Sequence, residues 1–303
     1  MQLGIQGIYG RRVTIGRRTT CKYGCIRYTF QCRAVDNFSS YEDFEYIDFD
    51  RRDNGVVIAT FNRPDTLNSA NVRLHREMSE IWHVVDADEQ VRCVVVTGAG
   101  RAFSAGGDMG MIEEMTSSYE AMLVQWRDAG AIVEKLISSR KPVVSAINGV
   151  AVGAGLAIAL MADISVMGES VRLTDGHVRI GVAAGDHGAL VWPMLCGMAK
   201  AKYYLMTADF LDGREAERIG LVSKCVPDDQ VLPEAIAIAE RLAAGSQLAI
   251  EWTKKALNGW YRQSMPIFGE SLALEMLCFL GEDVKEGVAA VKGKRPPNFS
   301  QRA

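Results

Sequence analysis

The sequence predicts an α/β fold in which parallel strands form the core. From Tyr41 onward, short apolar runs alternate with segments whose apolar residues recur at helical spacing, an order typical of a parallel sheet covered by helices. Two runs, VRCVVVTGAG (91–100) and KPVVSAI (141–147), are continuously apolar, as expected of strands buried on both faces. Beyond residue 195 the pattern becomes almost wholly helical, which predicts a helical region after this core.

The elements before residue 195 follow from local signals. The segment YIDFDRRDNGVVIATFNRP (46–64) predicts two strands joined by an Asn-Gly turn, a strong hairpin signal. Ser69 is a candidate N-cap for the first helix, because its hydroxyl can accept a hydrogen bond from the first turn. Helices are expected over SANVRLHREMSEIWHVVDAD (69–88), residues 118–138 and GLAIALMAD (155–163), and a further strand over ISVMG (164–168).

The second half of the chain predicts helices and no fixed-period repeat. The helical segments are AKAKYYLMT (199–207), GREAERIG (213–220), LPEAIAIAERLAAG (232–245), LAIEWTKKALNGW (248–260) and GESLALEMLCFLGE (269–282). We therefore divide the chain into a basic, flexible N-terminal extension (1–40), a core that carries the active site (41–195) and a helical C-terminal region (196–303) that serves in oligomerisation and ligand contacts.

Composition excludes several classes of protein. The chain has 303 residues, of which 48% are hydrophobic and 23% charged, and this balance is that of a folded globular protein. A net charge of −3 gives no overall attraction to nucleic acid, and no apolar run reaches the roughly 20 residues of a membrane-spanning helix. The seven cysteines are expected to be free thiols in a reducing compartment, and we predict no metal site.

Residues 1–40 differ from the rest of the chain. Seven Arg or Lys residues precede the first acidic residue, Asp36. This composition is typical of an organellar transit peptide, but an upstream start codon or an unstructured basic arm would give the same pattern. We expect a cytoplasmic protein, or a mitochondrial one if the segment is a transit peptide.

Two glycine-rich turns each leave a buried strand and enter a helix. They are TGAGRAFSAGGDMG (97–110) and INGVAVGAGLAIAL (147–160). Free backbone N–H groups at a helix start suit an anion or a developing oxyanion, and glycine lets a ligand approach the backbone closely. Neither turn has the Gly-Lys-Ser/Thr ending of a phosphate loop or the dinucleotide-binding spacing. Two tight turns without a ligand are the alternative.

With their surroundings, these turns resemble the crotonase (enoyl-CoA hydratase/isomerase) superfamily from about residue 45 to residue 299. The segments that carry the resemblance are FNRPDTLNSA, AFSAGGDMGMIEEM, KPVVSAINGVAVGAGLAIALMADI, EAERIGLVSKCVP and EGVAAVKGKRPPNF. The resemblance implies a ββα spiral superhelix followed by a helical trimerisation region, and a homotrimer or a hexamer built as a dimer of trimers.

The resemblance also implies a site for an acyl-CoA thioester. The backbone N–H groups of Gly107 and Ala154 would form the oxyanion hole, where they stabilise a thioester enolate. Ala105 and Asp108 lie in the loop that matches the family's CoA loop, and Lys294 matches a basic C-terminal residue that reaches the CoA of a neighbouring subunit. Coenzyme A enters as part of the substrate, and no separate cofactor is implied.

The catalytic residues depart from the family's hydratases. The two glutamates that handle water in those enzymes fall on Ala157 and His177. Asp186 stands where hydratases have a small residue, and it resembles the functional aspartate of the dienoyl-CoA isomerase and β-diketone hydrolase branches. We therefore predict a catalytic pair of His177 and Asp186, because a carboxylate orients an imidazole and stabilises its charged form. The alternative is a histidine and an aspartate that only satisfy backbone donors of the loop.

Three further residues are weaker candidates for the catalytic site. His187 follows the aspartate directly, and adjacent side chains usually point apart, so we rank it below His177. Asp175 is most simply a turn former. Glu275, on a strongly apolar helical stretch, is a possible third acidic group, with an interface or helix-cap role as the alternative.

Three functions remain open at this point. The first is an acyl-CoA enzyme that forms an enolate and uses histidine/aspartate chemistry, with isomerisation or C–C hydrolysis favoured over hydration. The second is a β-diketone hydrolase that acts on a substrate without CoA. The third is a non-catalytic homologue that binds acyl-CoA, or that binds RNA through residues 1–40.

Overall fold

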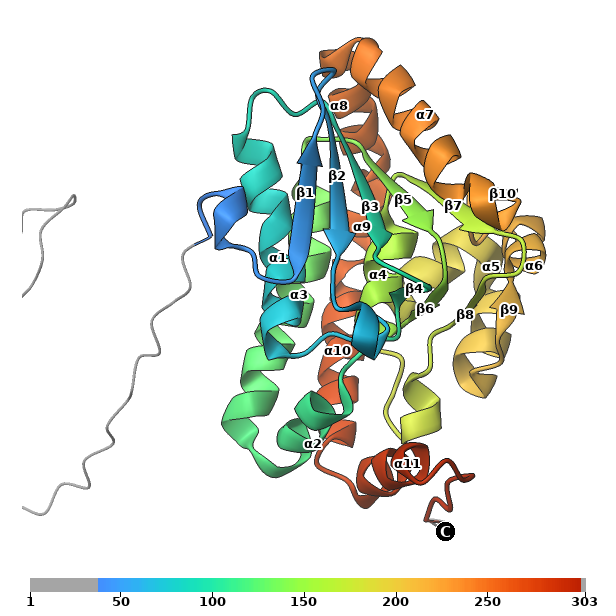
Figure 1. Cartoon of the computed structure of the whole chain (residues 1–303). Coiled ribbons are helices and arrows are strands. Elements are labelled where there is room, and N and C mark those ends of the chain that lie inside the picture. Colours follow the sequence, from blue (N-terminus) through green and yellow to red (C-terminus); the bar gives the residue numbers. More distant parts are fainter. Residues whose placement is uncertain (1–37, 301–303) are drawn as a thin grey trace, which may run out of the picture. The chain divides into compact units, whose positions relative to one another are not determined.

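Two sheets form the centre of the described chain, residues 38–300 of a computed structural model (Figure 1). In the larger sheet β1 runs antiparallel to β2, and every other neighbouring pair is parallel, which confirms the predicted α/β fold. Its strand order is β1 (Ile47–Arg51), β2 (Val56–Phe61), β3 (Cys93–Gly98), β5 (Val143–Ile147), β7 (Ile164–Gly168) and β10 (Lys224–Val226).

The smaller sheet continues from the carboxyl ends of several of these strands. Its order is β4 (Ala102–Ser104), β6 (Val150–Val152), β8 (Arg172–Thr174) and β9 (Leu211–Asp212). The helices are α1 (Val72–Ala87), α2 (Met109–Ser117), α3 (Tyr119–Ser138), α4 (Gly153–Met161), α5 (Gly188–Thr207), α6 (Gly213–Arg218), α7 (Val231–Ala244), α8 (Gln247–Leu257), α9 (Gly259–Gln263), α10 (Met265–Cys278) and α11 (Glu282–Lys292).

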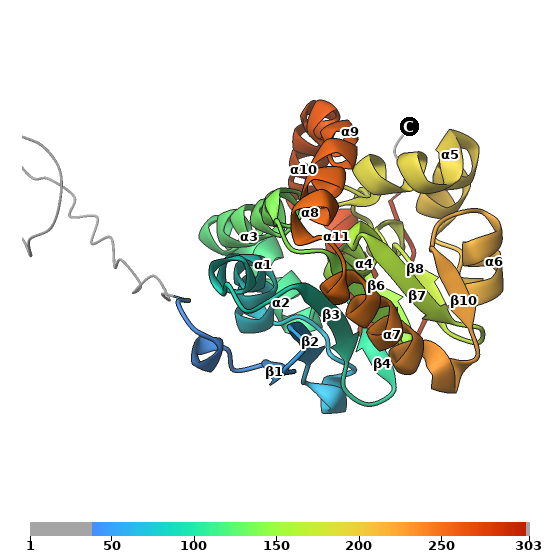
Figure 2. The same cartoon turned by 90° about the horizontal axis from the view of Figure 1, so that it is seen from above.

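Helices bury both faces of the larger sheet. Side chains of β2 alternate between the faces, as the pleat requires. Val57 and Phe61 pack into the main core with α1 and α3, whereas Val56 and Ile58 pack against α7. Figure 2 shows α7 on one side of these strands and α1 and α3 on the other. This two-sided burial explains why the strands read as continuous apolar runs.

The predicted hairpin is confirmed, but the predicted N-cap is wrong. Strands β1 and β2 pair in register across the Asn-Gly turn, where Gly55 has a φ of +84°. Helix α1 is capped by Asn71, whose side chain accepts a hydrogen bond of 2.8 Å from the backbone N–H of Leu74. Ala70 forms a β-bridge with Gly107, so a bridged residue stands between Ser69 and the helix, which begins only after Asn71.

Several elements differ from the expected pattern. The three- and two-residue strands of the smaller sheet, and β10, were not predicted, because such short runs carry little periodic signal. The change predicted between residues 195 and 196 falls inside α5, which is interrupted just afterwards at Gly197 (φ +77°). From Phe38 onward the chain forms one compact unit, and none of its described helices is long and apolar enough to cross a membrane.

The cysteine prediction can be checked for four of the seven residues. Cys93, Cys196, Cys225 and Cys278 are free thiols, as predicted, and Cys93 is buried. The other cysteines, and nearly all of the basic extension predicted for residues 1–40, lie outside the described residues.

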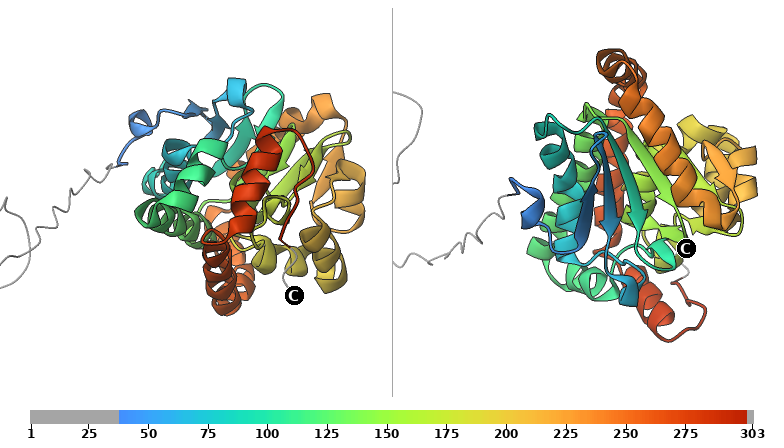
Figure 3. Two further views of the ribbon diagram at one scale, coloured as in Figure 1. Left: turned by 90° about the horizontal axis from the view of Figure 1, so that it is seen from below. Right: turned by 45° about the horizontal axis from the view of Figure 1, so that its top comes forward.

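The C-terminal helices return to the carboxyl ends of the central strands. Helix α11 packs against α2 and against the short 3-10 helix His177–Ile180, at one end of the molecule (Figure 3). A Cβ atom at Gly287 would lie 2.4 Å from the carbonyl oxygen of Ile180, so this close approach needs glycine. An ion pair of 2.5 Å between Lys292 Nζ and Glu113 Oε1 also joins α11 to α2.

Candidate active site

A cavity of about 130 Å³ lies where the glycine turns meet the segment 175–186. Its walls come from the loop after β4, the first turn of α4, the 3-10 helix at His177, and helices α1, α2, α3 and α10. Apolar and backbone groups form most of the lining, and a few polar side chains converge on one region. This composition is typical of a site for a small organic ligand.

The two glycine turns bring the predicted backbone donors to the same cavity. Gly107 and Ala154 both line it, and Ala154 lies in the first turn of α4, where N–H groups have no partner within the helix. A Cβ atom at Gly153 would lie 3.8 Å from the backbone nitrogen of Gly107, so the two loops are in direct proximity. A Cβ atom at Gly155 would lie 2.3 Å from Ser104 Cβ, and this glycine lets α4 approach β4. Gly107 and Ala154 therefore line the same cavity from two loops that lie next to each other.

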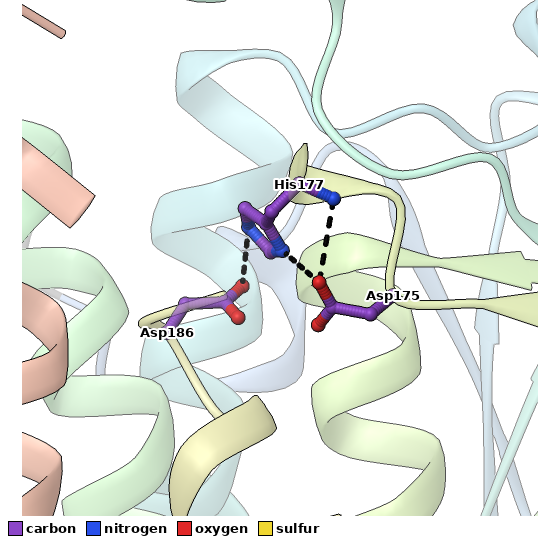
Figure 4. Close-up of side chains that lie close together, drawn as sticks. All are labelled: Asp175, His177 and Asp186. Carbon is purple, nitrogen blue, oxygen red and sulfur yellow. Dashed lines mark hydrogen bonds and ion pairs between the residues drawn. The ribbon is translucent and has the colours of Figure 1, made fainter. Parts of the chain in front are cut away.

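His177 lies among three carboxylates. Its Nδ1 atom is 2.8 Å from Asp175 Oδ1, and its backbone N–H donates to the same oxygen over 3.3 Å. Its Nε2 atom lies 3.7 Å from Asp186 Oδ2 and 3.7 Å from Glu275 Oε1. Figure 4 shows the imidazole between Asp175 and Asp186. Asp175 therefore orients the ring through Nδ1, and the carboxyl groups of Asp186 and Glu275 both lie near Nε2 on the other side of the ring.

The hydrogen-bond partner of Asp186 is His187. Its Nδ1 atom lies 2.6 Å from Asp186 Oδ1, and its Nε2 atom lies 3.8 Å from Asp175 Oδ2. The low rank that the sequence gave His187 is therefore wrong, as is the reading of Asp175 as a turn former alone. Adjacent side chains diverge along an extended strand, but at His187 the backbone turns to start α5. The two histidines and two aspartates thus form one buried cluster.

Glu275 reaches the cluster from α10. The loop that carries Asp186 packs tightly against this helix, because Ser271 Oγ donates to the carbonyl oxygen of Gly185 over 2.8 Å. A Cβ atom at Gly185 would lie 2.6 Å from Glu275 Cβ. Glycine at this position therefore lets the carboxyl of Glu275, which lines the cavity, approach the imidazole.

Burial and charge set the protonation states of this cluster. Burial alone would lower the pKa of His177, but Asp175, Asp186 and Glu275 outweigh it and raise the pKa well above its usual value. Burial opposes ionisation of Asp186, yet His177 and His187 hold its pKa below the usual range. Burial raises the pKa of Glu275 to about 8, with His177 acting in the opposite direction. Near neutral pH the site therefore combines a protonated imidazole, an ionised Asp186 and a neutral Glu275.

Of the remaining predicted site residues, one lines the cavity and two do not. Ala105 lines the cavity. Asp108 does not; its side chain accepts from the backbone N–H of Gly110 over 2.9 Å and caps α2. Lys294 lies on an exposed turn after α11, away from the cavity walls. Ala157 is buried within α4 and contributes no lining, so the position of the first family glutamate carries no polar group.

Two polar residues on the wall were missed by the sequence analysis. His75 on α1 and Gln125 on α3 both line the cavity and are buried. Each lies within an ordinary amphipathic helix, where the sequence gives no signal that separates it from its neighbours.

One atom from each of Asp175, His177 and Asp186 lies within 4.8 Å of the other two, a spacing that could hold a metal ion. The same side chains already interact as hydrogen-bonded and ion-paired partners, a geometry that suits a shared proton. That no metal takes part stays a prediction.

Comparison with known proteins adds independent findings. A sequence model described as enoyl-CoA hydratase/isomerase matches residues 51–302. A probable mitochondrial enoyl-CoA hydratase of Dictyostelium discoideum is 33% identical over 254 residues, which cover 82% of this chain and 88% of that protein. A mitochondrial enoyl-CoA hydratase of Pongo abelii is 30% identical over 291 residues, which cover 93% of this chain and 97% of the relative. The crystal structure of an enoyl-CoA hydratase/isomerase from Mycobacterium paratuberculosis is similar with a TM-score of 0.78 and 36% identity, over 82% of this chain and 99% of that one.

Proposed function

Because it matches the family model over most of its length, the chain belongs to the enoyl-CoA hydratase/isomerase family, and we propose that it forms an enolate from an acyl-CoA thioester. The thioester oxygen accepts hydrogen bonds from the backbone N–H groups of Gly107 and Ala154. Each such preaimed donor contributes about 3–4 kcal/mol to the stability of an oxyanion transition state. The pair of glycine turns at one cavity supports this step.

The acid–base groups are those of the histidine cluster. Asp186 is ionised and lines the cavity, so it removes the proton from the carbon next to the thioester carbonyl. His177, held by Asp175, then gives its proton to another carbon of the conjugated enolate, which completes an isomerisation, and Glu275 supplies a neutral hydrogen-bond donor. The single observation that carries this proposal is that the imidazole of His177 lies between carboxylates. Ala157 stands at the sequence position of a hydratase glutamate and supplies no carboxyl.

We favour isomerisation or hydrolytic C–C cleavage over simple hydration. Hydration in this family needs two carboxyl groups to handle one water molecule, and neither glutamate position holds a carboxyl here. A second candidate is hydrolysis of a β-diketone that carries no CoA. Hydrolytic C–C cleavage needs one group to activate a water molecule and another to protonate the leaving carbon. Asp186 and Glu275 both lie near Nε2 of His177, and this arrangement favours the second candidate.

A substrate panel separates these reactions. Crotonyl-CoA, a dienoyl-CoA and a cyclic β-diketone are assayed with the wild type, with His177→Ala and with Asp186→Asn. We expect both substitutions to lower turnover of the true substrate by about 100-fold, as for other general acids and bases. Turnover within about threefold of wild type in both variants would contradict the assignment, since that change is only about 0.6 kcal/mol. Rapid hydration of crotonyl-CoA by the wild type would contradict the preference against hydration.

CoA itself tests whether the substrate is a thioester. A ligand present at 100 times its Kd stabilises a folded protein by about 2.7 kcal/mol, so millimolar CoA should raise the melting temperature. No shift would favour the diketone substrate. A chain that turns over nothing in the panel but binds RNA through residues 1–40 would support the non-catalytic alternative.

We also propose that the chain assembles as a homotrimer or as a dimer of trimers. Helices α8, α9 and α10 expose large apolar side chains, and a patch of this kind marks a protein interface. Trp252 is 61% exposed, Trp260 67%, Leu277 62% and Leu280 62%. Light scattering of the wild type should give three or six chains, and Trp260→Lys should weaken the assembly. A monomeric wild type would contradict the proposal.

A further inference from the structure

Two buried polar side chains face the cavity from the wall formed by α1 and α3. His75 is 5% exposed and Gln125 is 3% exposed, and both line the cavity. Neither side chain makes a hydrogen bond within the described part of the chain, and His75 Nδ1 and Gln125 Oε1 are buried without any partner. A buried polar group left without a partner destabilises the folded chain, so two on one wall need an explanation.

The surrounding residues do not supply partners for this pair. Most of the nearby wall is apolar, with Met111, Ile112 and Met115 from α2. Behind it, Arg76 Nε donates to Asp128 Oδ2 over 3.1 Å and joins α1 to α3. This ion pair joins the two helices that carry His75 and Gln125, and it engages its own two side chains with each other.

The chemistry of the pair defines what it can bind. Burial lowers the pKa of His75 to about 4, against an opposing effect of Asp186, so the imidazole is neutral at physiological pH. A neutral imidazole offers one donor and one acceptor, a primary amide offers two N–H donors and an acceptor oxygen, and neither group carries a charge. Their complement is an uncharged oxygen, since an anion or a cation would find no opposite charge on these two groups.

We propose, building on the acyl-CoA function above, that His75 and Gln125 form a subsite for an oxygen substituent on the acyl chain. That substituent is a carbonyl or a hydroxyl group on a carbon beyond those that react at His177. The substrate class is therefore an oxygenated acyl chain rather than a plain unsaturated fatty acyl chain. Such a group offers a hydrogen-bond partner to the two side chains on this wall when the substrate binds, and an unsubstituted chain offers none.

The test compares three saturated CoA thioesters of equal chain length, with a distal keto group, a distal hydroxyl group or neither. Binding is measured by calorimetry with the wild type, and then with His75→Leu and Gln125→Leu. Met115→Leu is the control, because it alters the apolar part of the same wall. We expect the wild type to bind an oxygenated thioester about 5- to 150-fold more tightly than the plain one, because the substituent restores two hydrogen bonds. The stronger of the two oxygenated ligands identifies the substituent.

The variants and the turnover data then separate this inference from the proposed function. Each Leu variant should lower the preference by about 2- to 13-fold, the worth of one hydrogen bond, while Met115→Leu keeps it. Equal binding of all three thioesters by the wild type, or an unchanged preference in both Leu variants, would overturn the subsite. A preserved preference in binding with no turnover of any unsaturated counterpart would contradict the catalytic proposal alone. The wild-type measurement decides the question even if a variant does not fold.

Discussion

Asp175→Asn should impair catalysis without changing the shape of the site. The substitution keeps the size of the side chain but removes the charge that accepts from His177 Nδ1 over 2.8 Å. A hydrogen bond to a charged group contributes about 1.5–3 kcal/mol, and each 1.36 kcal/mol is about a factor of ten in rate. We therefore expect kcat/KM to fall about 10- to 150-fold.

The pH profile separates loss of orientation and charge from a general structural defect. In the proposed mechanism His177 donates a proton as imidazolium, so activity is full below its pKa and is lost as the pH rises through it. Asp175 helps to raise that pKa. Without its charge the pKa falls, and the alkaline loss of activity should move to lower pH.

Asp212→Asn is the matched control for Asp175→Asn. Asp212 is an exposed N-cap that accepts from the backbone N–H of Glu215 over 2.9 Å, and asparagine caps a helix equally well, so Asp212→Asn should keep full activity. Circular dichroism verifies that both variants are folded. If Asp175→Asn keeps kcat/KM within about threefold and its alkaline limb does not move, Asp175 does not act through His177.

Two further predictions concern stability. Gly185→Ala should destabilise the chain by about 1–3 kcal/mol in chemical denaturation, because its Cβ would lie 2.3 Å from the carbonyl oxygen of Ser271. Gly130→Ala is the control and should be neutral or slightly stabilising, because its Cβ would meet only Leu272 Cδ2 at 3.9 Å. Equal effects of the two substitutions would show that the loop at Gly185 does not pack against α10 as described. Glu275 has a folded-state pKa raised to about 8 from 4.5, so the stability gained from its protonated form is lost as the pH rises between these values. Glu275→Gln should therefore gain about 3–4 kcal/mol relative to wild type from about pH 5 to pH 8, and a difference that does not change with pH would contradict the buried neutral carboxyl.

Local patterns in the sequence predict much of this fold. The β1–β2 hairpin, the buried strands β3 and β5, and helix α3 each follow from a signal that lies within the element itself. The glycine turns predict free backbone donors near this place, but the choice of Gly107 and Ala154 came from the family resemblance, and both residues line the cavity. The short strands β4, β6 and β8 are missed because they depend on pairing with distant segments.

The sequence predicts which residues form the candidate site better than it predicts the hydrogen bonds between them. His177, Asp186 and Glu275 line one cavity, but the hydrogen bonds within the cluster were assigned differently. The sequence spacing suggested His177 with Asp186, whereas the backbone turn into α5 pairs Asp186 with His187 and leaves Asp175 to orient His177. Such pairings depend on side-chain direction, which sequence spacing does not determine.

Exchange of the protons next to the thioester carbonyl tests the central claim most directly, because it needs only enolate formation and not the natural substrate. A saturated acyl-CoA is incubated in D₂O with the wild type, Asp186→Asn or His177→Gln, and deuterium incorporation is followed by NMR. We expect the wild type to catalyse exchange and both variants to lose about 100-fold or more of that rate. Exchange in both variants within about threefold of wild type would contradict a histidine–aspartate acid–base site.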